Sequence, residues 1–393
     1  MSGDVWQFRM YIKQENKHYR KSLQTRDLDS ALSKGLNLAA ELHAKQNLGQ
    51  RIFGITLKDA IDQYLEHRQR DVVAGNITQG RWSTIRSHIN RLLDLKGKGI
   101  RTNELHPNSL FDYLLMRQEK GSVTKVTVRN EQATLNHFAK WAYQNGMLHF
   151  QAFEFDTIRI SPNEKGVRDT FTIDEYERLF TFMRSYTAKS RVSDPAERIE
   201  RQIMREYVLI SANTLMRVGE LRQLRWGDVL RVEKQTKDDT GRPVTPVHIK
   251  VRWETSKVRE EREIITRGGN YFERLCKHYA EAGVKLEPSD LVFRQVNKNE
   301  KFGHRIWAKH WYALMEGAKI LDHKERKVTW YSLRHFGISM RVNSGNNILD
   351  VAKMAGTSVS HVEKTYLKYD QKRMRKAILK GYVTEDGGFE DLD

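Results

Sequence analysis

Two tyrosines near the C-terminus, Tyr366 and Tyr369 in "GTSVSHVEKTYLKYD", raise the question of what a phenol can do in a strongly basic chain. A phenol is a poor nucleophile at neutral pH, because its ordinary pKa is about 10. A positive charge nearby favours the phenolate and lowers that pKa. A nucleophilic tyrosine therefore needs arginines or lysines that the rest of the chain holds beside it.

A first arginine of this kind lies in "SANTLMRVGELRQLRWGDV", where Arg217 and Glu220 are three residues apart beside a turn. The apolar residues around them indicate helices that pack into a core. An arginine held by a carboxylate one helical turn away is a pre-aimed guanidinium, suited to bidentate contact with a phosphate. Taken by itself, the pair is better explained as a structural ion pair.

A lysine lies in a second segment, "VHIKVRWETSKVREEREIITRGG", which predicts a β-hairpin. Alternating apolar residues precede the turn, and Ile264 or Ile265 continues the pattern after it. Lys257 falls at or near the hairpin tip, from which it could hand a proton to a leaving oxygen. A lysine at a hairpin tip more often serves only for solvation.

The remaining motifs lie further on, in "VTWYSLRHFGISMRVNSG" and the segments after it. The first predicts a helix that carries Tyr331, Arg334 and His335. Then "ILDVAKMAG" predicts a short apolar helix stopped by its glycine. Ser360 and Glu363 have capping-box spacing for the next helix, which would place Tyr366 about one and a half turns into it.

Taken in order, Arg217 with Glu220, Lys257, Arg334 with His335, and Tyr366 resemble the tyrosine recombinase (phage integrase) family. The "R-x-x-E-L" and "S-L-R-H" boxes are individually modest, but four motifs in the family order are specific together. The resemblance is strong over residues 169–370.

The resemblance implies a site-specific DNA recombinase that integrates and excises a mobile genetic element through a Holliday junction. Tyr366 would attack a backbone phosphate and leave a 3′-phosphotyrosyl link and a free 5′-hydroxyl. Arg217 and Arg334 would neutralise the charge of the transition state, Lys257 would protonate the departing oxygen, and Glu220 would orient Arg217. The covalent link stores the bond energy, so the family reaction needs no ATP, metal or other cofactor.

Two positions depart from the family pattern. Tyr331 stands where a histidine is usual, and Thr357 where a histidine or tryptophan is usual. Both can donate hydrogen bonds to a phosphate, but neither is a good general base near neutral pH. With His335, they are therefore predicted to be supporting residues. The spacing of nine residues between Thr357 and Tyr366, which is the family spacing, selects Tyr366 over Tyr369 as the nucleophile.

Two alternatives remain open at this point. The departures at Tyr331 and Thr357 are compatible with a catalytically impaired DNA-binding accessory or regulatory protein of the same fold. A relaxing topoisomerase of the related type is a third reading, against which the separate basic N-terminal hairpin argues.

The composition agrees with a nucleic-acid partner. The chain of 393 residues has 68 Lys and Arg against 50 Asp and Glu, a formal net charge of +18, which indicates a polyanion rather than a membrane. The single cysteine, Cys276, excludes an internal disulfide and indicates a reducing compartment. Without an apolar leader or a run of ~20 apolar residues, we expect a cytoplasmic, nucleoid-associated protein, and no Cys/His cluster has zinc spacing.

The N-terminal residues 1–50 predict a small sheet followed by a helix, which resembles an arm-site DNA-binding domain. Alternating apolar residues from Trp6 to Ile12 form the first strand, and the helix carries Leu28, Leu32 and Leu36 on its expected buried stripe together with Ala31 and Ala39. A β-ribbon that bears basic residues can enter a DNA groove. The basic residues expected to contact DNA here are Arg9, Lys13, Lys17, Arg20 and Lys21.

Residues 55–150 predict four helices and resemble a core-binding (SAM-like) domain, with Arg81 and Arg86 as DNA contacts. A linker without helical periodicity follows, and residues 169–383 form the predicted catalytic domain, with an acidic tail at 384–393. The fold class is therefore mainly α with small β-sheets (α+β). The resemblance implies double-stranded DNA as the partner, bound at core and arm sites by a homotetramer, together with a host bending protein and an excision factor.

Overall fold

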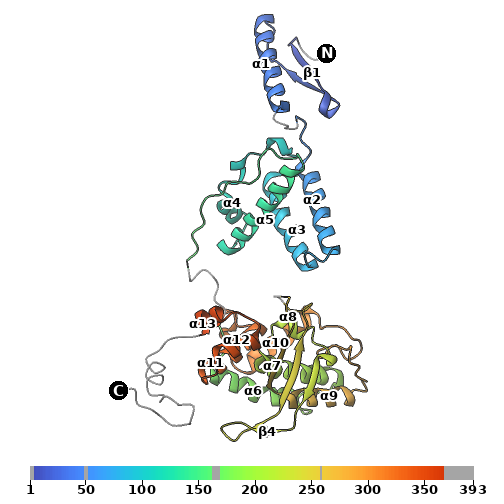
Figure 1. The fold of residues 1–393 in the computed structure, drawn as a ribbon, viewed down its shortest axis with the longest axis vertical. Helices are drawn as coiled ribbons and strands as arrows, with labels where there is room; N and C mark the ends of the chain where they lie inside the picture. The colour runs from blue at the N-terminus through green and yellow to red at the C-terminus, as the bar shows by residue number, and fades with distance from the viewer. Residues whose placement is uncertain (1–3, 48–51, 162–168, 257–258, 367–393) are drawn as a thin grey trace, which may run out of the picture. The chain divides into compact units, whose positions relative to one another are not determined.

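The computed structural model describes residues 4–47, 52–161, 169–256 and 259–366, the last residue by its backbone alone. The chain divides into two compact units, residues 1–167 and 168–393, each of which is described by itself (Figure 1). Among the described residues, no helix has both the length and the apolar character that a membrane span requires.

The mainly helical fold class with small antiparallel sheets is confirmed. The elements of the first unit are β1 (Gln7–Ile12), η1 (Lys13–Glu15), β2 (Lys17–Ser22), α1 (Leu28–Asn47), α2 (Leu57–Val73), α3 (Gln79–Lys96), η2 (Thr102–Glu104), η3 (Pro107–Leu110), α4 (Tyr113–Glu119) and α5 (Lys125–Gln144). Its division into separate domains at 1–50 and 55–150 stays a prediction.

The second unit contains α6 (Ile173–Tyr186), α7 (Pro195–Thr214), α8 (Val218–Leu221), η5 (Trp226–Asp228), β3 (Val229–Val232), β4 (Thr236–Lys237), β5 (Pro243–Val244), β6 (Pro246–Val251), β7 (Arg262–Arg267), α9 (Gly269–Glu281), α10 (His304–Gly317), η6 (Leu321–His323), α11 (Trp330–Asn343), α12 (Ile348–Ala355) and α13 (Val359–Tyr366).

The N-terminal hairpin packs one face of its two strands against α1. Phe8, Met10 and Ile12 alternate toward the helix, as the period of two predicts. The expected burial of Leu28, Leu32 and Leu36 is wrong, since these leucines are exposed, Leu36 to 71%. Ala31 of the predicted stripe is buried, together with Leu38 and Leu42, so the buried face is centred about 100° around the helix from the three leucines.

Helices α2, α3, α4 and α5 share one core, which includes Tyr64 and Phe138. Threonine side chains cap α2, α3 and α5 by accepting a hydrogen bond from the backbone N–H three residues on. Pro107 opens the short η3 rather than a continuous helix, and α4 begins only at Tyr113. Of the four helices predicted in residues 55–150, the third is thus broken into two pieces.

The second unit builds a three-stranded antiparallel sheet, in the order β3-β6-β7, next to helices that include α7 and α9. Val247, Ile249 and Val251 of β6 are buried, as predicted. Of the two isoleucines that the sequence left open, Ile264 faces the core and Ile265 is exposed. The β6–β7 hairpin is therefore registered by its apolar face, with Ile249 opposite Ile264.

The beginning of the second unit is tied to the N-terminal end of α11. The Ser332 hydroxyl donates to the Asp169 carbonyl, and the Thr170 hydroxyl donates to the Ser332 carbonyl. Arg326 adds hydrogen bonds to the carboxylates of Asp169 and Glu175. These contacts fix the helical turn that also carries Arg334, two residues beyond Ser332.

Helix α11 also approaches α7 unusually closely, and a glycine makes this possible. A Cβ atom at Gly337 would lie 2.1 Å from the carbonyl oxygen of Ala212 and 2.7 Å from a methyl carbon of Leu215. No side chain fits there unless one helix moves. Gly337 is one helical turn from Arg334, so the close approach of the two helices determines how near the Arg334 side chain lies to the end of α7.

We expect Gly337→Ala to lower the free energy of unfolding by about 1–3 kcal/mol, because the added methyl group forces α11 away from α7. Urea unfolding of the purified protein measures the change. The matched control is Gly219→Ala in α8, where an added Cβ meets no described atom within 4 Å. Equal stabilities for the two variants would contradict the close-packing explanation.

Candidate active site

Arg217 is placed by the turn between α7 and α8. Helix α7 ends at Leu215, whose φ of 56° lies in the left-handed region, and Arg217 is the N-terminal cap of α8. A left-handed leucine is strained by roughly 1–2 kcal/mol. Burial of its side chain against Ile338 and Val362 opposes that strain. The core of the unit therefore sets the direction in which Arg217 leaves the helix.

The pair of Arg217 and Glu220 forms as the sequence indicates. Nη1 of Arg217 donates to Oε1 of Glu220 at 2.8 Å, and the Arg217 backbone N–H donates to Oε2 at 3.0 Å. The Glu220 side chain is only 1% exposed. Burial raises the pKa of Glu220, but the hydrogen bonds and charges of Arg262 and Arg217 outweigh it, so the pKa is lowered overall. Glu220 is thus an ionised, buried carboxylate.

Arg262 is the second partner of Glu220, and sequence reasoning missed it. Its Nη2 donates to Oε2 of Glu220 at 2.7 Å, and its Nε donates to the carbonyl of Met354 at 3.4 Å. Arg262 begins β7, directly after the connection that carries Lys257. The repeated charges of "VREERE" conceal it, and only its position at the start of the apolar strand pattern could have drawn attention to it.

Arg334 reaches the same turn from α11. Its side chain is buried, and Nη1 donates to the Leu215 carbonyl at 2.5 Å. Leu215 is two residues before Arg217, so their Cα atoms are at most ~7.6 Å apart. The two arginines, far apart in the sequence, therefore converge on one turn of the backbone.

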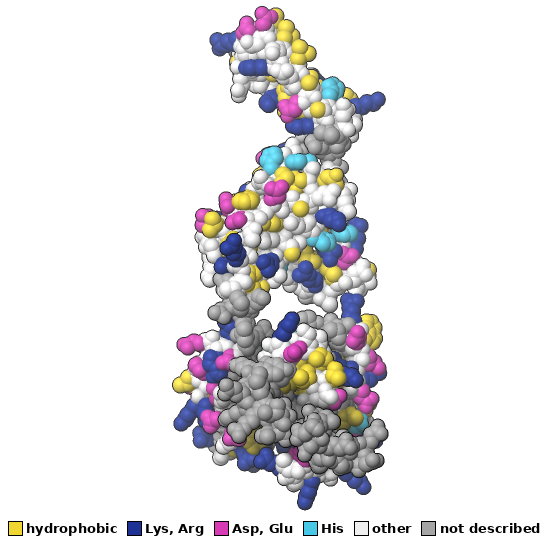
Figure 2. All heavy atoms as spheres, turned by 60° about the vertical axis from the view of Figure 1, so that its left-hand side comes forward, with side chains coloured by type: hydrophobic (Ala, Val, Ile, Leu, Met, Phe, Trp, Pro, Cys, Tyr) yellow, Lys and Arg dark blue, Asp and Glu magenta, His cyan; other side chains and the backbone are white. Residues whose placement is uncertain are grey.

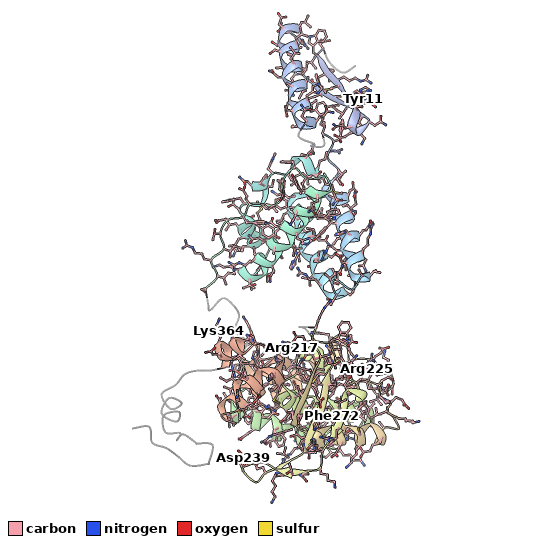
Figure 3. All side chains as sticks on the ribbon, in the orientation of Figure 1. Tyr11, Arg217, Arg225, Asp239, Phe272 and Lys364 are labelled. Carbon is pink, nitrogen blue, oxygen red and sulfur yellow. The ribbon has the colours of Figure 1, made fainter. Side chains whose placement is uncertain are left out.

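The turn between α12 and α13 closes the site from a third direction. Gly356 ends α12 with a φ of 60°, and its carbonyl accepts a hydrogen bond from Nη2 of Arg217 at 2.5 Å. Figure 3 shows Arg217 and Lys364 of α13 at the same end of the second unit. The segments that carry the Arg217, Arg334 and Gly356 motifs therefore meet at the α7–α8 turn.

Helix α13 begins earlier than expected. Ser358, not Ser360, provides the capping hydroxyl, which accepts from the backbone N–H of His361 at 3.2 Å. The sequence "SVS" offers two serines at possible cap positions, and the structure uses the first. Tyr366 is consequently the eighth residue of α13. Its side chain, Lys257 and Tyr369 lie outside the described residues.

The predicted supporting residues lie around this turn. Tyr331 is one turn before Arg334 on α11, and its ring meets that of His335 edge to face, with centroids 4.8 Å apart. Both rings are half-buried, and Thr357 is half-buried directly after Gly356. The backbone N–H of Thr357 donates to the Ala352 carbonyl, which holds the turn in place.

The basic residues predicted on the N-terminal hairpin are not all on one face. Arg9 and Arg20 lie directly opposite each other on the exposed face, where like charges repel. Lys17 and Lys21 pair with Ile12 and Phe8 on the alternate face, which packs on α1. Lys13 lies in the connecting η1. Only Arg9 and Arg20 thus form an open pair across the ribbon.

Arg81 and Arg86 are both exposed on α3, but they point in different directions. Five residues of an α-helix correspond to a rotation of about 140°, and the buried stripe of Ile85 and Ile89 lies between them. Arg86 lies over the ring of Trp82, with its guanidinium carbon 5.5 Å from the centroid. On the face that Figure 2 shows, Lys and Arg side chains of the second unit are mixed with acidic ones.

The described residues contain no group of three or more His, Cys, Asp or Glu side chains that could hold a metal ion. Cys276 is half-buried on α9, and burial raises the pKa of its thiol. The side chains of Arg217 and Arg334 bring fixed positive charge and hydrogen-bond donors to the α7–α8 turn.

We expect Arg334→Met to lower the free energy of unfolding by about 1.5–3 kcal/mol, because the buried Leu215 carbonyl loses a charged hydrogen-bond donor. Lys353→Met removes the same charge from an exposed position of α12 and should change stability by less than ~0.5 kcal/mol. Chemical unfolding of both variants provides the comparison. An Arg334 variant as stable as the Lys353 variant would show that the contact with the Leu215 carbonyl does not stabilise the fold.

Comparison with known proteins places the chain in a family. Residues 169–373 match the model of the phage integrase family. A search of curated proteins found no match. Two of the similar solved structures are the Tn1549 transposon integrase with transposon right-end DNA (TM-score 0.57, 15% identity, covering 82% of this chain and 98% of that chain) and a lambda integrase dimer bound to a COC′ core site (0.56, 13%, 94% and 97%).

A third similar structure is the XerH site-specific recombinase bound to palindromic difH, with a TM-score of 0.56 and 15% identity, covering 76% of this chain and 78% of that chain. At these identities the structures show a shared fold. The family match spans more than half of the 393 residues, and it contains Arg217, Glu220, Arg334 and Tyr366. The protein therefore belongs to the phage integrase family, the tyrosine recombinases.

Proposed function

We propose that the protein is a site-specific DNA recombinase that integrates and excises a mobile genetic element. Membership of the family supports site-specific recombination as the general activity. The observation that supports the strand-cleavage chemistry is the convergence of Arg217 and Arg334 on the α7–α8 turn, next to the turn that leads into α13. Two guanidinium groups brought to one turn of the backbone would together bind a single phosphodiester.

The two arginines would act on the transition state rather than on the ground state. Attack by a phenolate adds negative charge to a phosphodiester that already carries one, and fixed cations stabilise that increase most. Among the described residues, Glu220 and Gly356 take up two of the five N–H donors of the Arg217 guanidinium. The Arg217 side chain is 15% exposed, so a phosphate could reach its remaining donors.

Tyr366 is the proposed nucleophile and Lys257 the proposed general acid. Helix α13 begins three residues after Gly356, whose carbonyl accepts from Arg217, so one short helix connects the arginine site to the backbone of Tyr366. Lys257 belongs to the connection between β6 and β7, and the first residue of β7, Arg262, contacts Glu220. Glu220 would orient Arg217, and Tyr331, His335 and Thr357 would support phosphate binding.

The earlier part of the chain would bind DNA outside the reacting phosphate. We assign arm-site binding to residues 1–50, core-site binding to 55–150 and catalysis to 169–383, with 384–393 as an acidic tail. The similar structures are DNA complexes, and lambda integrase has been crystallised as a tetramer on a Holliday junction. For this chain we propose a homotetramer on double-stranded DNA in the cytoplasm, with a host bending protein and an excision factor as further partners.

The departures from the family pattern at Tyr331 and Thr357 favour a second candidate function, that of a DNA-binding accessory protein of the same fold. The ring contact between Tyr331 and His335 brings a histidine next to the position where the family usually has one. An accessory protein would bind its site tightly and with strong salt dependence, but would exchange no strands.

The test uses a duplex that carries the direct repeat flanking the element, with a nick beside the cleavage site. After attack, the short strand between the cleavage site and the nick dissociates with its 5′-hydroxyl, so the strand cannot be rejoined. The covalent protein–DNA adduct therefore accumulates and is quantified on a denaturing gel. We expect the wild type and Tyr369→Phe to form the adduct and Tyr366→Phe to form none, since phenylalanine lacks the attacking oxygen.

Each contrary result has a distinct meaning. Adduct formation by Tyr366→Phe at the wild-type level would exclude Tyr366 as the nucleophile. Tight binding by the wild type without any adduct would favour the accessory protein. Relaxation of a supercoiled plasmid without the repeat would favour a topoisomerase.

A further inference from the structure

We infer that Arg262 is a positioning residue of this active site, which shares the buried Glu220 carboxylate with Arg217 and so leaves Arg217 with positive charge for a phosphate. The inference rests on the proposed function and adds a residue that the four motifs do not contain. It is carried by three sets of contacts, which involve Glu220, Met354 and Gly356.

The first set is the sharing of Glu220. Arg262 reaches Oε2 of the carboxylate at 2.7 Å and Oε1 at 3.4 Å, while Arg217 reaches Oε1 at 2.8 Å. Both oxygens therefore have an arginine donor, and the carboxylate is almost fully excluded from water. Arg262 comes from a strand 42 residues further along the chain, so this contact is set by the tertiary fold alone.

The charges explain why a second arginine matters. One buried carboxylate and Arg217 alone sum to zero, and a phosphate approaching that pair would meet the carboxylate as well as the guanidinium. With Arg262, two cations and one anion leave a net charge of +1 around Glu220. In a site with little water, such a difference in charge is screened weakly. The sharing thus preserves the attraction that the reaction needs.

The other two sets of contacts extend to the turn before α13. Nε of Arg262 donates to the Met354 carbonyl at 3.4 Å. A Cβ atom at Gly356 would lie 2.6 Å from Cζ of Arg262, so the guanidinium fills the space that the glycine leaves. One side chain therefore connects the β6–β7 hairpin, α8 and the α12–α13 turn. A planar guanidinium with five donors can make these contacts together, whereas a lysine cannot.

The competing explanation is that Arg262 and Glu220 form an ion pair that only stabilises the fold. Variants that remove one or both of these charges distinguish this explanation from the positioning role. Arg262→Met removes the second cation, so the negative charge of Glu220 is balanced by Arg217 alone. We expect adduct formation on the nicked duplex to slow about 10- to 100-fold, by analogy with the loss when a partner that orients a metal ligand is removed. DNA binding, measured by gel shift, should change by less than about threefold because the other phosphate contacts remain.

The decisive variant is the double substitution Arg262→Met with Glu220→Gln. Compared with the wild type, it lacks one charge of each sign, so the net charge of +1 is restored. We therefore expect the logarithm of its rate to lie at least about a third of the way from that of Arg262→Met to that of the wild type. A structural role predicts the opposite, because the double variant has lost still more hydrogen bonds. The matched control is Arg267→Met at the other end of β7, an exposed arginine paired with Asp238, which should react like the wild type.

Thermal unfolding of each variant accompanies the rates. If Arg262→Met fails to fold, Arg262→Lys and Arg262→Gln replace it, and the lysine variant, which keeps the charge, should react at least about fivefold faster than the glutamine variant. Equal rates for these two, or a double variant no faster than Arg262→Met at equal stability, would overturn the inference. Normal adduct formation by Arg262→Met would overturn it and leave the proposed function standing. A wild type that forms no adduct would overturn the proposed function and the inference with it.

Discussion

The arrangement of the candidate active site depends on one buried carboxylate. Glu220 is ionised in an environment that excludes water, and an ionised group can remain there only if cations and hydrogen bonds compensate it. Arg217 and Arg262 provide both. Arg217 lies at the α7–α8 turn and Arg262 at the start of β7, far along the chain. The need to balance the buried charge of Glu220 therefore holds the α7–α8 turn against β7.

Close backbone approaches complete the site around this carboxylate. Gly337 lets α11 pack against the end of α7, which allows Arg334 to reach the Leu215 carbonyl. Gly356 ends α12 and leaves room for the guanidinium of Arg262, while its carbonyl accepts from Arg217. The conformation of Leu215 aims the chain toward α8. Positive charge is thus concentrated at one turn by backbone geometry as much as by side-chain pairing.

The first unit illustrates how far local patterns extend. The alternation of Phe8, Met10 and Ile12 predicted the buried face of the ribbon, because strand side chains alternate regardless of their neighbours. The same reasoning chose the wrong stripe of α1, where the leucines from Leu28 to Leu36 compete with a second apolar stripe. Periodicity reports that a stripe exists, and only the partner surface decides between two stripes.

The sequence by itself determined the fold class, the family and the pairing of Arg217 with Glu220, since these depend on composition, motif order and contacts within one helical turn. It did not indicate Arg262, the cap at Ser358, or the separation of the basic residues on the hairpin between two faces. Those features depend on which distant segments pack together, and close packing of the core settles this only once the whole chain has folded.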